Sequence, residues 1–163
     1  MSDLDQLTAL SIEVQQLHSN ARPDLFREPN PEALRKYLEK ELKLSLHKDL
    51  NKDQGETSVL FLVAEQENHS IGYLLGKTVN RSENPFRHST QFFYVDQLVV
   101  ARSAHRLGIG STLMKAAEMH AVKTGAHNLQ LDSWAFNTSA HHFFEQLGFA
   151  PMNIIFAKEL TAD

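Results

Sequence analysis

The segment from residue 90 to residue 123 constrains the fold more than any other part of this chain. Residues 90–100 are almost continuously apolar, which is typical of a central strand covered on both faces. A connection with glycines at 108 and 110 follows, and residues 108–123 then repeat apolar side chains at helical spacing. In such a segment, several backbone N–H groups of the glycine turn and of the first turn of the helix are directed at one place. This segment therefore predicts an anion site.

Local patterns predict further helices and strands around this segment. Apolar side chains at three- and four-residue steps predict helices over residues 4–19 and 31–46, and Asn137 can cap a short helix that ends at residue 147. The other predicted strands are residues 58–65, 70–79, 127–134 and 152–160. The chain thus predicts a single α/β (α+β) domain over residues 1–163, in which a hairpin is followed by strand, helix, strand, helix and strand around one sheet.

Composition limits the classes of function. The 163 residues carry 16 basic and 20 acidic side chains, so the net charge of -4 gives no overall electrostatic surface for nucleic acid or an anionic membrane. Cysteine is absent, which excludes disulfides and cysteine nucleophiles, and the nine histidines lack the spacing of a metal-binding helix. The start lacks a signal-peptide pattern and no apolar run is long enough to span a membrane, so we expect a cytoplasmic protein without a metal.

Two common nucleotide-binding motifs fit the sequence poorly. Residues 72–78 resemble a phosphate-binding loop, but three residues separate the glycines where four are needed, and the stretch lies within a predicted strand. Gly72 and Gly76 instead indicate a bulge or close backbone packing. The turn at residues 108–110 lacks the third glycine of a dinucleotide-binding fold, because Leu113 occupies that position.

Three segments in combination resemble the GNAT superfamily of N-acetyltransferases. Leu98-Val99-Val100 and the following His105-Arg106-Leu107-Gly108-Ile109-Gly110 are similar to its pyrophosphate-binding signature, and residues 137–149 are similar to its N-x-x-A-x-x-F-Y-x-x-x-G-F element. Residues 21–26, with the sequence ARPDLF, also resemble a segment of one bacterial group of members. The resemblance implies a mixed, mostly antiparallel twisted sheet flanked by helices, without the family's usual first strand, because only residues 1–3 precede the first predicted helix.

The resemblance also implies acetyl-coenzyme A (acetyl-CoA) as co-substrate. Leu98 and Val100 would offer backbone groups to the pantetheine arm, residues 106–111 would hold the pyrophosphate through main-chain N–H groups, and Asn137 and Phe144 would flank the pantetheine. For Asn137 a helix cap is an equally good interpretation. The implied donor-binding residues are Leu98, Val99, Val100, His105, Arg106, Leu107, Gly108, Ile109, Gly110, Ser111, Asn137, Ala140, Phe143 and Phe144.

Two positions depart from the family pattern. His105 stands where the signature usually has Arg or Gln, which matters little if backbone amides bind the anion. Phe144 stands where many members have a tyrosine that protonates the departing thiolate, so the usual general acid is absent. The chain is then either an active N-acetyltransferase, since a thiol of pKa about 8.5 leaves readily without an acid, or a protein that binds or senses acyl-CoA without catalysis.

The implied reaction is attack by a primary amine of a small molecule or peptide on the thioester. The amine must lose a proton first, and Asp96 is the leading candidate base because it lies on the central strand near the expected thioester. Weaker candidates are Glu65, Tyr94, His141 and His142.

The acceptor surface is less defined by the sequence. Side chains that could line it are Arg22, Asp24, Arg27, Arg87 and His88. The segment Arg22-Pro23-Asp24 fits a helix-ending turn equally well, because Pro and Asp are common in turns. A homodimer is compatible with the family.

Overall fold

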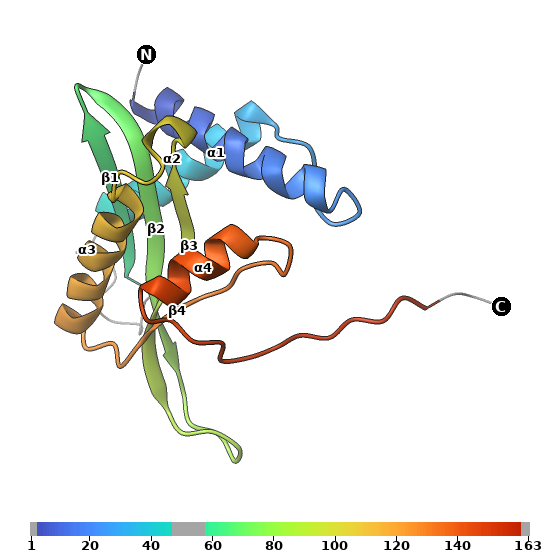
Figure 1. Cartoon of the computed structure of the whole chain (residues 1–163). Helices are drawn as coiled ribbons and strands as arrows, with labels where there is room; N and C mark the ends of the chain where they lie inside the picture. The colour runs from blue at the N-terminus through green and yellow to red at the C-terminus, as the bar shows by residue number, and fades with distance from the viewer. Residues whose placement is uncertain (1–2, 47–57, 161–163) are drawn as a thin grey trace. The chain divides into compact units, whose positions relative to one another are not determined.

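The computed structural model describes residues 3–46 and 58–160 (Figure 1). The chain divides into two units, Met1–Asp132 and Ser133–Asp163. The elements of the first unit are α1 (Asp3–Ala21), α2 (Pro31–Leu46), β1 (Val59–Gln66), β2 (His69–Arg81), β3 (Thr90–Val100), a 3-10 turn (Arg102–Ala104), α3 (Ile109–Lys123) and β4 (Leu129–Leu131). The second unit contains α4 (Thr138–Gln146). The predicted bounds of α2 and β3 are confirmed to the residue, and the other predicted helices are confirmed with small shifts at their ends.

The strands of the first unit form one sheet in the order β1-β2-β3-β4. β2 pairs with β1 and with β3 in antiparallel fashion, whereas β3 and β4 are parallel and are joined through α3. The predicted class, a mixed and mostly antiparallel sheet flanked by helices, is therefore confirmed. The glycine turn lies between the end of β3 and α3, as residues 90–123 predict. In the described ranges, no helix is long and apolar enough to cross a membrane.

One predicted strand is wrong and another is shorter than predicted. Residues 152–160 are exposed and belong to no strand, although Met152, Ile154 and Phe156 alternate as in a strand. A strand forms only where a neighbour supplies hydrogen-bond partners, and periodicity does not test for that neighbour. The strand expected at residues 127–134 shortens for the same reason to Leu129–Leu131, the residues that pair with β3.

Helices cover both faces of the sheet in the first unit. Tyr73 of β2 is fully buried in a cluster with side chains of α1 and α2. The adjacent Gly72 lies against Ile109 and Leu113 of α3. Because neighbouring residues of a strand point to opposite faces, α1 and α2 cover one face and α3 covers the other.

A β-bulge interrupts β3 at Asp96. The register with β2 shifts between Leu75 and Gly76, which leaves Asp96 as an extra residue on β3. Before the bulge the side chains of the odd-numbered residues of β3 face α3, because the Phe93 ring contacts His120 of that helix. After the bulge they face α1 and α2, because Val99 packs with those helices. The prediction of a bulge or close packing at Gly76 is confirmed.

The substitution Gly76→Ala tests this packing. A Cβ at position 76 would lie 2.5 Å from the ring of Phe93, which is fully buried, and 2.8 Å from the Tyr94 carbonyl oxygen. We expect the free energy of unfolding, measured by urea denaturation, to fall by about 1–3 kcal/mol, the usual cost of overpacking. The cost should shrink in a Phe93→Leu background, where the ring is gone. An equal cost in both backgrounds would mean that the ring is not the obstacle.

Candidate active site

β3 presents a free backbone edge after the bulge. Its ladder with β4 ends at Val95, and in the described part of the chain no strand continues that ladder. The N–H of Ala101 donates to the Ile71 carbonyl of β2 at 2.8 Å. Since hydrogen-bonded pairs alternate along an antiparallel ladder, the N–H and C=O groups of Leu98 and Val100 point away from β2, toward the free edge.

Val99 lies differently from the two residues that flank it. Its backbone faces β2, and its side chain is buried against α1 and α2. Before the bulge the backbone groups of the odd-numbered residues of β3 face β4 instead, since the Phe93 N–H donates to the Asn128 carbonyl at 3.0 Å. The bulge at Asp96 therefore determines which backbone groups lie on the free edge.

The start of α3 carries unpaired backbone donors. Gly108 caps the helix with a φ of 80°, in the left-handed region that glycine adopts without a steric penalty. The N–H groups of Ile109, Gly110 and Ser111 have no carbonyl partner within an α-helix. No acidic side chain lies in this first turn. Together with the positive end of the helix dipole, these donors form a place where an anion can bind.

The residues before Gly108 form a turn that touches the end of β3. The His105 Nε2 lies 3.0 Å from the Val100 carbonyl oxygen, so that carbonyl has a partner within the protein and the Val100 N–H is the group left at the edge. Arg106 has a φ of 64°, which is uncommon for a residue with a side chain, and both Arg106 and Leu107 are exposed. The residues predicted to bind pyrophosphate thus gather in one turn beside the free edge.

The Asp96 side chain lies on the face covered by α1 and α2. Its Oδ1 accepts a hydrogen bond from Lys77 Nζ of β2 at 2.8 Å. The Asp96 side chain is 24% exposed, and the residue as a whole is exposed. The candidate base is therefore accessible, and it has a counter-charge beside it.

Tyr94 lies on the same face and contacts a second carboxylate. Its hydroxyl donates to Asp132 Oδ2 at 2.6 Å. Asp132 directly follows β4, so this bond joins the two strands where their ladder ends. Burial raises the pKa of Tyr94, and the hydrogen bond to Asp132 and the charges of Asp132 and Asp96 raise it further. The phenol is therefore neutral at physiological pH.

α2 borders the same region through Tyr37 and Glu41. Burial raises the pKa of Tyr37 to about 12, with smaller contributions from the Glu41 and Asp96 carboxylates. Tyr73 donates to Gln97 Oε1 at 2.7 Å, and burial raises its pKa to about 12. We use the name β3 polar cluster for Lys77, Tyr94, Asp96 and Asp132.

The segment after α1 is a turn in which Arg22 and Asp24 contact each other. Arg22 Nε and Nη2 donate to the two carboxylate oxygens of Asp24 at 2.8 and 2.6 Å, and this contact lowers the pKa of the Asp24 carboxyl. These bonds support the helix-ending turn as the interpretation of the segment. The other acceptor and base candidates of this unit, all exposed, are Arg27, Glu65, Arg87 and His88.

The second unit contains α4 and the residues of the second predicted motif. Asn137 Oδ1 accepts a hydrogen bond from the Ala140 N–H at 3.3 Å, so the helix-cap interpretation is confirmed. Phe144 is half-buried, and its ring centroid lies 5.3 Å from that of Phe143 and 5.8 Å from that of Phe149. Within this unit Phe144 therefore belongs to an aromatic cluster.

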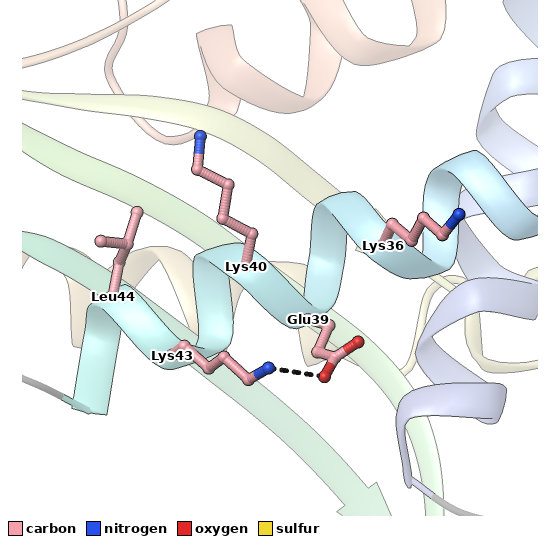
Figure 2. Close-up of a pocket in the computed structure, with 5 residues that line it drawn as sticks. All are labelled: Lys36, Glu39, Lys40, Lys43 and Leu44. Atoms are coloured by element: carbon pink, nitrogen blue, oxygen red, sulfur yellow. Dashed lines mark hydrogen bonds and ion pairs between the residues drawn. The ribbon is translucent and has the colours of Figure 1, made fainter.

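A shallow hollow on α2 holds none of the predicted site residues. It is lined by Lys36, Glu39, Lys40, Lys43 and Leu44 (Figure 2). Lys43 Nζ lies 2.7 Å from Glu39 Oε1, and Lys36 Nζ lies 2.8 Å from Glu32 Oε1. These two lysines therefore form ordinary surface ion pairs along the helix. The candidate site is therefore the edge of β3, the start of α3 and the β3 polar cluster, not this hollow.

A family comparison covers most of the chain. Residues 16–149 match the model of the Acetyltransferase (GNAT) family, and this range includes β3, α3 and α4. The chain belongs to the GNAT family. No curated protein matches the chain.

Solved structures share the GNAT fold. A mutant of the BH1408 protein from Bacillus halodurans has a TM-score of 0.79 at 21% identity, covering 98% of this chain and 94% of that chain. A putative acetyl transferase from Pyrococcus furiosus has a TM-score of 0.58 at 23% identity, covering 91% and 92%. The aminoglycoside N-acetyltransferase AAC(6')-Iy, solved in complex with CoA, has a TM-score of 0.59 at 18% identity, covering 80% and 90%.

GNAT membership supports acetyl transfer from acetyl-CoA in general terms and does not define the acceptor. The GNAT motifs located the turn and the free edge, but sequence reasoning missed Lys77 and Asp132. Lys77 lies 19 residues before its partner Asp96, and Asp132 lies 38 residues after its partner Tyr94. No local sequence pattern links residues that meet only through strand register.

Proposed function

We propose that this chain is an acetyl-CoA-dependent N-acetyltransferase that acts on a primary amine of a small molecule or peptide. The observation that carries the proposal is the free edge of β3 beside the start of α3. An unpaired strand edge suits an extended arm that contains amides, as pantetheine does. An uncapped helix start with no acidic side chain suits a pyrophosphate.

The donor-site residues of the first unit fit this ligand through their backbones. The N–H groups of Leu98 and Val100 lie on the free edge, and those of Ile109, Gly110 and Ser111 lie at the start of α3. Because backbone groups make these contacts, His105 in place of Arg or Gln costs little. In the second unit, a part in donor binding stays a prediction for Asn137, Ala140, Phe143 and Phe144.

Asp96 is the proposed base for the first proton of the amine. An alkylammonium has a pKa near 10.4, so a group of the enzyme must accept a proton before the nitrogen lone pair can attack the thioester carbonyl carbon. Asp96 is accessible on the face opposite α3, at the bulge where β3 and β4 separate. The Lys77 ammonium beside it stabilises the carboxylate until the amine arrives.

One observation favours a second candidate function. Phe144 carries no hydroxyl at the position of the usual acid, as expected of a protein that binds or senses acyl-CoA without turnover. Release of free thiol from acetyl-CoA, followed with a thiol reagent across a panel of primary amines, separates the two. Amine-dependent release supports the transferase. If no amine of the panel releases thiol but CoA still binds in calorimetry, the result supports the binding protein. Absence of CoA binding contradicts both candidate functions.

Phe144→Tyr tests whether the missing hydroxyl limits the rate. We expect kcat to rise several-fold, because a tyrosine at this position could protonate the departing thiolate, with little change in CoA affinity. The matched control is Phe143→Tyr, which adds a hydroxyl to the neighbouring half-buried ring and should not raise kcat. An unchanged kcat in Phe144→Tyr would show that thiolate protonation is not limiting.

A further inference from the structure

Tyr94 and Asp132 form a hydrogen-bonded pair where β3 and β4 separate. Tyr94 pairs in register with Gln130, and Asp132 lies two positions further along the same strand direction, so both side chains project from the same face of the sheet. Their bond, 2.6 Å long, joins the two strands at the end of the ladder. The proposed function uses neither side chain.

The direction of this hydrogen bond defines what the pair can do. A phenol has one proton to donate and an oxygen that can accept. Its proton points to Asp132, so the Tyr94 oxygen is the atom that an incoming N–H can approach. The raised pKa of Tyr94 also makes it a poor acid for a thiolate whose conjugate thiol has a pKa near 8.5. The pair is therefore suited to receive a proton from a positively charged nitrogen.

The charged groups around the pair come from three elements. Asp96 lies on β3 itself and its charge acts on Tyr94. Lys77 of β2 is paired with Asp96, and Tyr37 and Glu41 of α2 border the same region. Asp96 is thus engaged by a cation in the described structure, whereas Asp132 is engaged by a neutral phenol.

An ammonium that becomes an amide nitrogen must lose two protons. Asp96, as the proposed base, accounts for the first, which leaves the neutral amine. When the nitrogen lone pair has formed the new N–C bond, the nitrogen is again positively charged and must lose another proton before the product can form. This second proton also needs an acceptor while the nitrogen is charged, and a side chain near Asp96 can supply one.

We propose that Tyr94 and Asp132 take this second proton as a relay. The Tyr94 oxygen accepts the N–H proton while the phenol proton passes to Asp132 Oδ2. The electron pair on the carbonyl oxygen then re-forms the C=O bond and the C–S bond breaks. The sulfur leaves with the electron pair of the C–S bond and takes a proton from solvent. Asp132 finally returns its proton to solvent through Tyr94. The relay rests on the proposed function, because it requires an amine acceptor.

Two conservative variants test the relay. Tyr94→Phe removes the relaying oxygen, and Asp132→Asn keeps an oxygen that accepts the phenol hydrogen bond but cannot take its proton. We expect each to lower kcat by about 100-fold or more, with unchanged CoA affinity and unfolding midpoint. The double variant should be no slower than either single variant, because the two groups act as one unit.

A spectroscopic measurement tests the pair apart from turnover. Asp132→Asn removes the carboxylate that raises the pKa of Tyr94, so the phenolate of Tyr94 should appear at lower pH in an ultraviolet titration. The Tyr94→Phe variant identifies this signal among the three tyrosines. A Tyr94 titration that does not move in Asp132→Asn would overturn the pairing.

The possible failures are distinguishable. An active wild type whose Tyr94→Phe variant keeps its kcat overturns the relay and leaves the proposed function intact. An active wild type in which Asp132→Asn keeps its kcat while Tyr94→Phe loses it assigns Tyr94 a role without Asp132, which also overturns the relay. A wild type that binds CoA but releases no thiol with any amine overturns the proposed function, and the relay with it.

Discussion

Gly110→Asp should weaken CoA binding by at least about 100-fold, which corresponds to about 2.8 kcal/mol. Position 110 is the second residue of α3, among the three N–H groups that have no partner within the helix. A carboxylate there would lie where the pyrophosphate is expected and would repel it, in addition to filling space that glycine leaves open. Titration calorimetry with CoA measures the effect.

The design separates binding from folding. An acidic side chain in the first turn of a helix interacts favourably with the helix dipole, so Gly110→Asp should not lower the unfolding midpoint. Gly110→Ala is the matched control, since it adds a Cβ without charge and should weaken CoA binding far less. If Gly110→Asp binds CoA as tightly as the wild type does, the start of α3 is not the anion site and the donor assignment is wrong.

Asp96→Asn should lower kcat by about 10²- to 10⁴-fold, the range over which a positioned general base usually contributes. The amide has nearly the shape of the carboxylate and can still accept a hydrogen bond from Lys77, but it cannot take a proton from the ammonium. CoA affinity should change little, because the proposed donor contacts are backbone groups of β3 and α3. Steady-state kinetics at saturating acetyl-CoA provide the measurement.

Lys77→Met is the matched control for Asp96→Asn. It breaks the same ion pair but leaves the carboxylate in place. If Asp96 serves only as the partner of Lys77, the two variants should have similar effects on kcat. If Asp96 is the base, Asp96→Asn should lose far more activity than Lys77→Met. Equal losses would therefore remove Asp96 as the base.

The sequence predicted the elements whose patterns are long and continuous. β3 and α2 have the predicted bounds because eleven and sixteen residues, respectively, repeat a clear pattern. The turn before α3 was predicted correctly as a structure, and Gly108 adopts a left-handed conformation before the helix. Its role in binding an anion stays a prediction. In these segments local preferences and the final fold agree.

Tertiary pairing could not be predicted from the same patterns. The bulge at Asp96 changes which residues of β3 face the free edge, and it depends on the shift between Leu75 and Gly76 on another strand. Gly76 indicated a bulge or close packing but not its effect on Leu98 and Val100. The contacts of Asp96 and Tyr94 follow from that register, so the β3 polar cluster emerged only from the structure.

The wrong strand has a related cause. Met152, Ile154 and Phe156 alternate with other residues as in a strand, yet residues 152–160 form none. Alternation records which side chains could share a face, whereas a ladder also needs a neighbouring strand with matching donors and acceptors. Sequence periodicity contains no information about that neighbour.

Backbone amide NMR during a titration with CoA tests the central claim most directly. If the edge of β3 and the start of α3 bind the donor, the amides of Leu98, Val100, Ile109, Gly110 and Ser111 should shift most. The amide of Val99, which faces β2, is the internal control and should shift less. The account would be contradicted if saturating CoA left these five amide signals unmoved, or if it shifted instead the amide signals of the residues that line the hollow on α2.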